Sequence, residues 1–208
     1  METLDRYLAQ LASTEPTPGG GSAAALVAAV GAALVAMAAR ISSQNPKYAA
    51  QHEMALRLAA AADALRAELT AARDRDERAF ARVVAAQALP RESDAEREAR
   101  TRALETALGD AAAVPLRACE LCMDVLRLSL QTLQIPNKNL ASDLGCAAEF
   151  AVAALAACAY NVRVNHRYMR DAAAIETQSK MLARYETEAP ALLANVRRDV
   201  GAALARPR

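Results

Sequence analysis

The feature that most constrains this chain is an uncharged run, residues 23–39, that consists mostly of alanine. Alanine is the strongest helix former and adds little side-chain volume, so such a run favours a helix that neighbouring helices can approach closely. The run is short and weakly apolar for a transmembrane span. We therefore expect a helix that is buried on all sides within a soluble protein.

The rest of the composition favours the same class of fold. Aromatic residues make up 3% of the 208 residues and tryptophan is absent, whereas a sheet core needs many β-branched and aromatic side chains. Alanine, leucine, arginine and glutamate dominate instead, and they favour helices. We predict a single all-α domain over residues 1–208, folded as an up-and-down bundle of about six long helices.

Charge and the N-terminal segment bear on partners and location. The formal net charge is +1, and both signs are interspersed without a basic stripe, so we expect no nucleic acid partner. The segment METLDRYLAQLAS contains acidic residues and lacks the apolar core of a signal peptide. We therefore expect a cytoplasmic protein that binds no membrane.

Turn-forming residues divide the chain into helical segments. The predicted helices cover residues 4–12, 22–42, 48–88 and 93–133, then a segment from 142 to beyond 165, and the C-terminal tail. Pro115 predicts a kink or a break in the fourth helix, and Pro190 predicts an interruption of the sixth.

The chain has four cysteines, of which Cys119 and Cys122 have the CxxC spacing of redox and zinc sites. They occur in an apolar helical stretch without a second CxxC pair, and the chain has only two histidines. We therefore expect these two, together with Cys146 and Cys158, to pack as small apolar side chains.

An acidic residue interrupts the apolar face of the third predicted helix. Steps that alternate between three and four residues keep every member of a stripe on one face. Asp76 falls on this face, where a carboxylate must be paired or hydrated in a cleft. The alternative is a partly exposed Asp76, or one paired with Arg73 or Arg75. The stripe comprises Met54, Leu58, Ala61, Leu65, Leu69, Ala72, Asp76, Phe80, Val83 and Gln87.

The fifth predicted helix repeats this pattern. Its place in the first turn explains Asp143, because the helix dipole favours an acid there. Asn161 and Asn165 lie deeper on an apolar face, and buried amides need hydrogen-bond partners. A polar cleft between the third and fifth helices explains these amides together with Asp76. The stripe comprises Asp143, Ala147, Phe150, Ala154, Cys158, Asn161 and Asn165.

The triple glycine at residues 19–21 precedes the uncharged helix, and Ser22 is a good N-cap for it. The first backbone N–H groups of a helix have no partner within the helix, and glycines let a ligand approach them closely. Such a helix start favours anions or electron-rich carbonyl groups.

These segments resemble those of the cyclodeaminase/cyclohydrolase family of tetrahydrofolate enzymes, and the resemblance runs through most of the chain. PTPGGGSAAAL, at residues 16–26, is the most specific segment. The shorter ones follow in the expected order: DERAF at 76–80, ALPR at 88–91, VPL at 114–116, NKNLASDLG at 137–145 and NVRVN at 161–165.

The resemblance implies an enzyme that is a helical homodimer, with a tetrahydrofolate derivative in a cleft at or near the subunit interface. The deaminase reaction closes a ring on the formimino carbon and releases ammonia, whereas the hydrolase reaction adds water to the methenyl carbon. Both pass through a tetrahedral carbon. Neither requires a metal or a cofactor beyond the tetrahydrofolate, and a stand-alone chain is compatible with either activity or with both.

The resemblance also implies site residues. Asp76 and Asp143 are the expected catalytic carboxylates, one for the pterin and one for protons, and the sequence does not decide which. Arg40 and Lys47 are weaker candidates for binding the glutamate tail. The expected substrate-binding residues are Pro18, Gly19, Gly20, Gly21, Ser22, Lys138, Asn139, Asn161 and Asn165.

Two alternatives stay open. Asp74 and Glu77 are further acids in the segment DRDERAF, although they point away from the apolar stripe. The chain is alternatively a non-catalytic helical module that binds a folate or mediates oligomerisation. A bundle without any ligand leaves the inward acidic and amide side chains unexplained.

Overall fold

The computed structural model describes residues 3–205. Within this range the chain is helical and contains no β-strand, which confirms the all-α class. A short first helix precedes five long ones, and two short 3-10 helices, η1 and η2, lie between long helices. The elements are α1 (Leu4–Leu11), α2 (Gly20–Gln44), η1 (Pro46–Gln51), α3 (His52–Gln87), α4 (Asp94–Thr132), η2 (Lys138–Leu140), α5 (Ala141–His166) and α6 (Ala172–Leu204).

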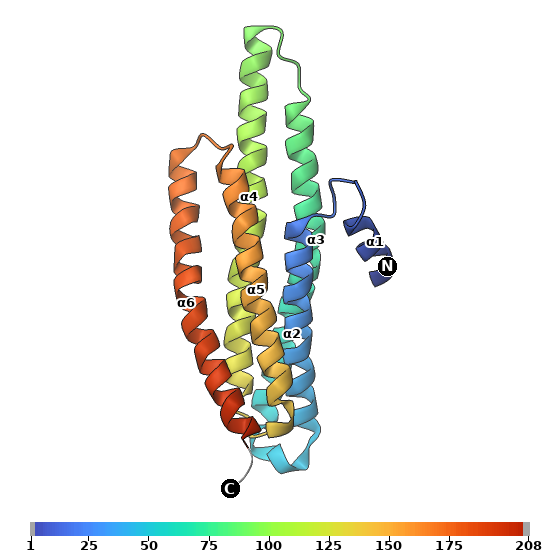
Figure 1. Cartoon of the computed structure of the whole chain (residues 1–208), viewed down its shortest axis with the longest axis vertical. Helices are drawn as coiled ribbons and strands as arrows, with labels where there is room; N and C mark the ends of the chain where they lie inside the picture. Colours follow the sequence, from blue (N-terminus) through green and yellow to red (C-terminus); the bar gives the residue numbers. More distant parts are fainter. Residues whose placement is uncertain (1–2, 206–208) are drawn as a thin grey trace.

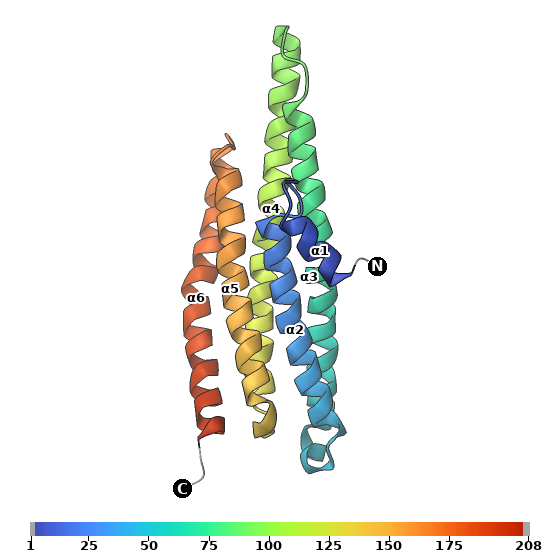
Figure 2. The same ribbon diagram turned by 45° about the vertical axis from the view of Figure 1, so that its right-hand side comes forward.

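The long helices form an up-and-down bundle, as predicted, because short connections make consecutive helices antiparallel. α2 packs against α3 and α5, α4 packs against the same two helices, and α6 covers α4 and α5 (Figures 1 and 2). α3 and α4 extend beyond the others as a long hairpin, whereas α1 lies outside the bundle beside the start of α2. The start of α2 and the end of α5 therefore lie at the flank of this hairpin.

Local sequence sets the start of α4, but prolines do not end helices here. Ser93 and Glu96 form a complete capping box, with reciprocal bonds between side chain and backbone. α4 continues through Pro115 and α6 continues through Pro190. The predicted interruption of the sixth helix is therefore wrong. A proline removes one helical hydrogen bond, and the packing of flanking residues such as the buried Ala189 offsets this loss.

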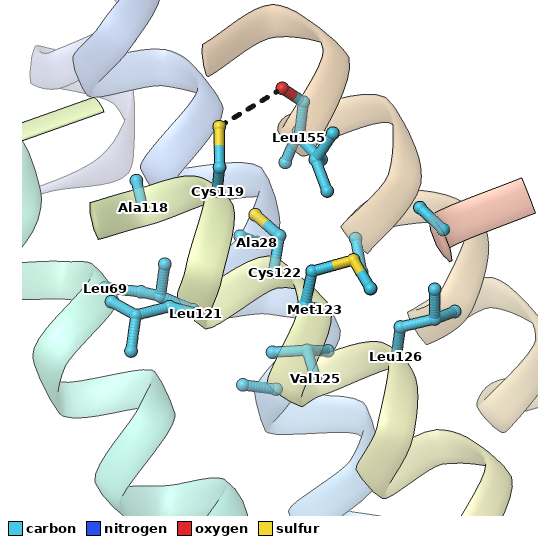
Figure 3. Packing of buried hydrophobic residues seen from close by; sticks show 14 of the residues in the cluster. Ala28, Leu69, Ala118, Cys119, Leu121, Cys122, Met123, Val125, Leu126 and Leu155 are labelled. Carbon is cyan, nitrogen blue, oxygen red and sulfur yellow. Dashed lines mark hydrogen bonds between the residues drawn. The ribbon is translucent and has the colours of Figure 1, made fainter. Parts of the chain in front are cut away.

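The main core is made of small and medium-sized side chains from α2 to α6. Close packing of this kind needs small residues where backbones approach each other. Gly31 is one example, because a Cβ atom there would lie 3.0 Å from the carbonyl oxygen of Ala147. Figure 3 shows the interlocking side chains Ala28, Leu69, Ala118, Cys119, Leu121, Cys122, Met123, Val125, Leu126 and Leu155.

Three of the four cysteines belong to this core, as predicted: Cys119, Cys122 and Cys158 are buried. The thiol of Cys119 donates a hydrogen bond to the carbonyl oxygen of Leu155 at 3.6 Å (Figure 3). The expectation is wrong for Cys146, which is exposed on the outer side of α5.

α2 is not buried on all sides, contrary to expectation, because Val27, Val30, Met37 and Ile41 are exposed. By length and composition alone, α2 and the segment Lys138–His166 are each apolar enough to cross a membrane. The helix that contains the uncharged run is also longer than predicted, since α2 covers Gly20–Gln44 instead of residues 22–42. Core helices of soluble proteins share this length and composition, and most of the α2 span is buried within the bundle.

Candidate active site

A cleft of about 350 Å³ opens at the flank of the α3–α4 hairpin, where the glycine segment and the last turns of α5 meet it. The walls come from the loop before α2, the first turn of α2, and one face each of α3, α4 and α5. The lining residues are Pro16, Thr17, Gly19, Gly20, Gly21, Asp76, Phe80, Val83, Gln87, Leu108, Ala111, Asn161, Val164, Asn165 and Tyr168. The third and fifth predicted helices thus border one cleft.

The arrangement requires glycine at the start of α2. A Cβ atom on Gly21 would lie 2.7 Å from the carboxyl carbon of Asp76, which is closer than real Cβ contacts come. A Cβ atom on Gly20 would lie 3.5 Å from Nδ2 of Asn161. The first N–H groups of a helix lack partners within it. The glycines therefore let the Asp76 carboxylate lie directly against a helix start.

Asp76 is the one acidic side chain among the described residues that line the cleft. It is half-buried, whereas Asp74 is exposed. Burial raises the pKa of the Asp76 carboxyl to about 6, although a hydrogen bond from the backbone N–H of Ser22 opposes this rise. The charges of Cys158 and Glu77 make smaller contributions that also raise the pKa. Such a carboxyl exchanges protons close to neutral pH.

Two amide side chains lie opposite Asp76, one turn apart on α5. The side-chain nitrogen of Asn161 donates to the carbonyl oxygen of Ala157 at 2.9 Å. That of Asn165 donates to the backbone carbonyl oxygens of Ala111, at 3.0 Å, and of Asn161, at 2.8 Å. Within residues 3–205, no donor bonds either side-chain carbonyl oxygen. These two oxygens can therefore accept hydrogen bonds from a ligand.

The remaining walls are mostly apolar or aromatic. Phe80 is 41% exposed and Tyr168 is 62% exposed, so both offer ring surface to a ligand. None of the described residues that line the cleft is a lysine or an arginine. A carboxylate without a lysine or arginine among its described lining residues, set between flat apolar walls, favours a planar ligand that carries positive charge and hydrogen-bond donors.

Sequence reasoning missed several lining residues. Tyr168 continues the α5 stripe three residues beyond Asn165, so the periodicity could have identified it. Gln87 belongs to the predicted stripe of the third helix and lines the cleft too. Pro16 and Thr17 line it from the loop, where no periodic signal exists.

Some predicted site residues lie outside the cleft. Pro18 is buried and is not a lining residue. Ser22 is fully buried behind the cleft wall, and it is the third residue of α2 rather than its N-cap, because the helix already begins at Gly20. Arg40 pairs with Asp63 on the outer surface.

The loop end of the bundle, which contains η1 and η2, holds the other predicted residues. Lys138 and Asn139 belong to η2, and Asp143 lies in the first turn of α5. Asp143 and Asn161 are about five turns, or roughly 27 Å, apart along this helix. The prediction that Asp76 and Asp143 border one cleft is therefore wrong within a single subunit. The reason is that α5 runs antiparallel to α2, so its first turn lies at the opposite end from the glycine segment.

Comparison with known proteins gives three results. Residues 3–184 match the family model described as Formiminotransferase-cyclodeaminase. The methenyltetrahydrofolate cyclohydrolase of Methylorubrum extorquens is 38% identical over 191 residues, which cover 92% of each chain. The formimidoyltransferase-cyclodeaminase of Rattus norvegicus is 33% identical over 169 residues, which cover 81% of this chain and 31% of the rat protein.

The fold is shared with a solved structure as well. The crystal structure of formiminotetrahydrofolate cyclodeaminase from Thermotoga maritima matches with a TM-score of 0.87 at 25% identity. The match covers 98% of this chain and 98% of that chain. The helical bundle and the order of its helices are therefore common to both proteins.

Proposed function

This chain belongs to the formiminotransferase-cyclodeaminase family, and on that premise we propose that it is a folate one-carbon enzyme that hydrolyses methenyltetrahydrofolate to formyltetrahydrofolate. The similarity to a cyclohydrolase over nearly the full length of both chains supports this choice. Conversion of formiminotetrahydrofolate to methenyltetrahydrofolate and ammonia is the second candidate, supported by the whole-chain likeness to a cyclodeaminase.

The observation that carries the proposal is the single carboxylate of Asp76 in a cleft without lysine or arginine among its described lining residues. The methenyl group joins two folate nitrogens as a planar cation, so a nearby carboxylate stabilises it. A pKa of about 6 suits Asp76 to accept and return a proton near neutral pH. The carbonyl oxygens of Asn161 and Asn165 suit the amine and amide donors of a pterin.

We propose the following steps. Water attacks the methenyl carbon, a C–O bond forms, and Asp76 takes the proton that the water loses. One C–N bond of the tetrahedral carbon then breaks as the hydroxyl proton leaves and the carbonyl forms, and the departing ring nitrogen gains a proton. One proton is released overall. In the deaminase reaction a folate amine attacks instead of water, and ammonia departs.

The test is an absorbance assay with methenyltetrahydrofolate and formiminotetrahydrofolate in parallel. We expect the methenyl chromophore to decay in the first assay, whereas its appearance in the second would identify the deaminase. Asp76→Asn should lower kcat by about a thousandfold, and the matched control Asp74→Asn, an exposed acid two residues away, should stay within about twofold. The proposal would be contradicted if the methenyl chromophore neither decayed in the first assay nor appeared in the second.

We also propose a homodimer that forms through the α2–α5 face. This face is defined by exposed apolar side chains on two adjacent helices, and α2 has no charged residue from Gly20 to Ala39. An uncharged face of this length marks an interaction surface. Its members are Val27, Val30, Met37, Ile41, Phe150 and Val164.

A second copy is the occupant that fits this face best. The face extends from Val164, beside the cleft, to Ile41, near the loop end. A two-fold axis through its middle exchanges these ends. The partner subunit's Lys138 and the partner subunit's Asp143 would then lie beside the cleft that holds Asp76. In such a dimer the segment with Lys138 and Asp143 of one subunit would lie near Asp76 of the other, whereas the two segments lie at opposite ends of one subunit.

Subunit mixing tests the dimer. Asp76→Asn and Asp143→Asn homodimers are each expected to be inactive. In a random mixture, a mixed dimer has one site with both aspartates, so activity should return to about a quarter of that of the native protein. Absence of recovery would show that no active site combines Asp76 of one subunit with Asp143 of the other. Light scattering that shows an active 22.0 kDa monomer would contradict the shared site.

A further inference from the structure

Tyr7 is the one buried residue of α1. Tyr7 is 2% exposed, whereas Leu4 and Leu8 of the same helix are 61% and 49% exposed. α1 lies outside the bundle at the level where α2 begins (Figures 1 and 2). The guanidinium carbon of Arg73 lies 4.0 Å from the centroid of the Tyr7 ring, a cation–π distance that fixes the ring on one side. Tyr7 therefore anchors α1.

The Tyr7 hydroxyl leads to Ser22. Its oxygen lies 3.1 Å from Oγ of Ser22, which is fully buried. The Ser22 hydroxyl donates to Oε1 of Glu77 at 3.2 Å. A serine hydroxyl has one proton, so Ser22 cannot also donate to Tyr7. The direction is thereby fixed: Tyr7 donates to Ser22, and Ser22 donates to Glu77.

Ser22 also bonds the catalytic carboxylate. Its backbone N–H donates to Asp76, while its hydroxyl holds Glu77, the next residue of α3. One residue of α2 thus holds two consecutive carboxylates of α3, one through the backbone and one through the side chain. Gly21 removes any side chain that would keep Asp76 away from this helix start.

We propose that Tyr7, Ser22 and Glu77 are positioning residues that fix the carboxylate of Asp76 within the cleft. None of the three lines the cleft, so they act through Asp76 rather than on the substrate. The inference rests on the proposed function, in which the side chain of Asp76 is the catalytic carboxylate. It gives α1 a role in catalysis although α1 does not border the site.

The effect of Glu77 on Asp76 can be measured as a change in the pKa of Asp76, because few other charged groups surround this carboxyl. α2 presents the Ser22 N–H and no charged side chain, and α4 presents Leu108 and Ala111. α5 presents Cys158 beside the two amides, and α3 itself contributes Glu77. Glu77 raises the pKa of Asp76 through its negative charge. Removal of that charge therefore lowers the pKa of Asp76.

The first experiment compares Tyr7→Phe with Tyr48→Phe, a buried tyrosine at the loop end. Without the Tyr7 hydroxyl, the Ser22 side chain keeps only its hydrogen bond to Glu77. We expect kcat for the methenyl substrate to fall by about tenfold, with KM within about twofold. Tyr48→Phe should leave kcat unchanged. Equal kcat values for Tyr7→Phe and the native protein would overturn the role of Tyr7.

The second experiment needs no turnover. Carboxyl-labelled aspartate is titrated by ¹³C NMR, and the Asp76 resonance is assigned by its absence in Asp76→Asn. We expect its midpoint to move to lower pH in Glu77→Gln and to stay in place in Glu53→Gln, an exposed acid of the same helix. A native kcat in Glu77→Gln would overturn the positioning role of Glu77, and an unmoved midpoint would overturn the link between its charge and Asp76. If the native protein converts neither folate, the proposed function fails, while an unmoved midpoint still counts against the inference by itself.

Discussion

The two ends of the bundle, the cleft end at the start of α2 and the loop end with η1 and η2, each carry an inward acid and a buried serine, but these residues have different roles. At the cleft end Asp76 lies deep on an apolar face, and burial raises its pKa. At the loop end Asp143 occupies a first helical turn, where the helix dipole accommodates an acid. A serine of α2 is buried at each end: Ser22 bonds the acid Glu77, whereas Ser42 bonds the amide of Asn137. Within one subunit, an inward polar residue therefore indicates a site only where the fold has not already accommodated it, and Asp143 reaches a site only across the proposed dimer interface.

Apart from replacing Asp76 itself, the largest expected effect comes from Gly21, where the start of α2 meets the cleft. Gly21→Ala places a methyl group against the Asp76 carboxyl, so either the carboxylate or the start of α2 must move. We expect kcat/KM to fall by at least about a hundredfold. The control is Gly109→Ala, because no atom lies within 4 Å of an added Cβ there. A Gly21→Ala protein with native kcat/KM would show that contact between Asp76 and the helix start is dispensable.

The next largest expected effect is the pH dependence of kcat/KM, which should follow the ionisation of Asp76 in the cleft. In the proposed mechanism only ionised Asp76 takes a proton from water, and its pKa is about 6. We expect kcat/KM to fall about tenfold for each pH unit below 6. The measurement is the initial rate between pH 5 and pH 8, corrected for the uncatalysed reaction. A profile that is flat down to pH 5 would remove Asp76 as the base.

Stability should respond with opposite signs at the two aspartates. Folding raises the pKa of Asp76 from 3.8 to about 6, so the native state binds this proton more tightly than the unfolded state. The ionised carboxylate therefore costs stability as the pH rises through this interval, and the cost is complete above pH 6. We expect Asp76→Asn to raise the free energy of unfolding at pH 8 by about 1–2 kcal/mol, a value reduced for partial exposure.

Asp143→Asn removes an acid from a first helical turn, so we expect a loss of about 0.5 kcal/mol at pH 8. Urea unfolding at pH 8 and pH 4 measures both variants, and the gain from Asp76→Asn should vanish at pH 4, where the native side chain is already protonated. A gain of the same size at both pH values would mean that burial of the charge is not its cause.

Sequence periodicity predicted which side of each helix faces inward, and so it identified Asp76, Asn161 and Asn165. It did not predict how far along the bundle each residue lies, because that depends on the antiparallel offset of α2 and α5. Asp143 was misplaced for this reason. The start of α2 was misjudged because contact between Gly21 and Asp76, a tertiary interaction, lets the helix begin before Ser22. Tyr7 gave no signal, since its partners are distant in sequence.

The last comparison is between the two buried serines of α2. Ser42→Ala removes the acceptor of the Asn137 amide, and Ser22→Ala removes the hydroxyl between Tyr7 and Glu77. Each variant should lose about 1 kcal/mol in the free energy of unfolding, measured in urea, because each loses buried hydrogen bonding. Only Ser22→Ala should lower kcat as well. If Ser42→Ala lowered kcat equally, looser packing of α2 would explain both losses, and the contrast between the two ends would not hold.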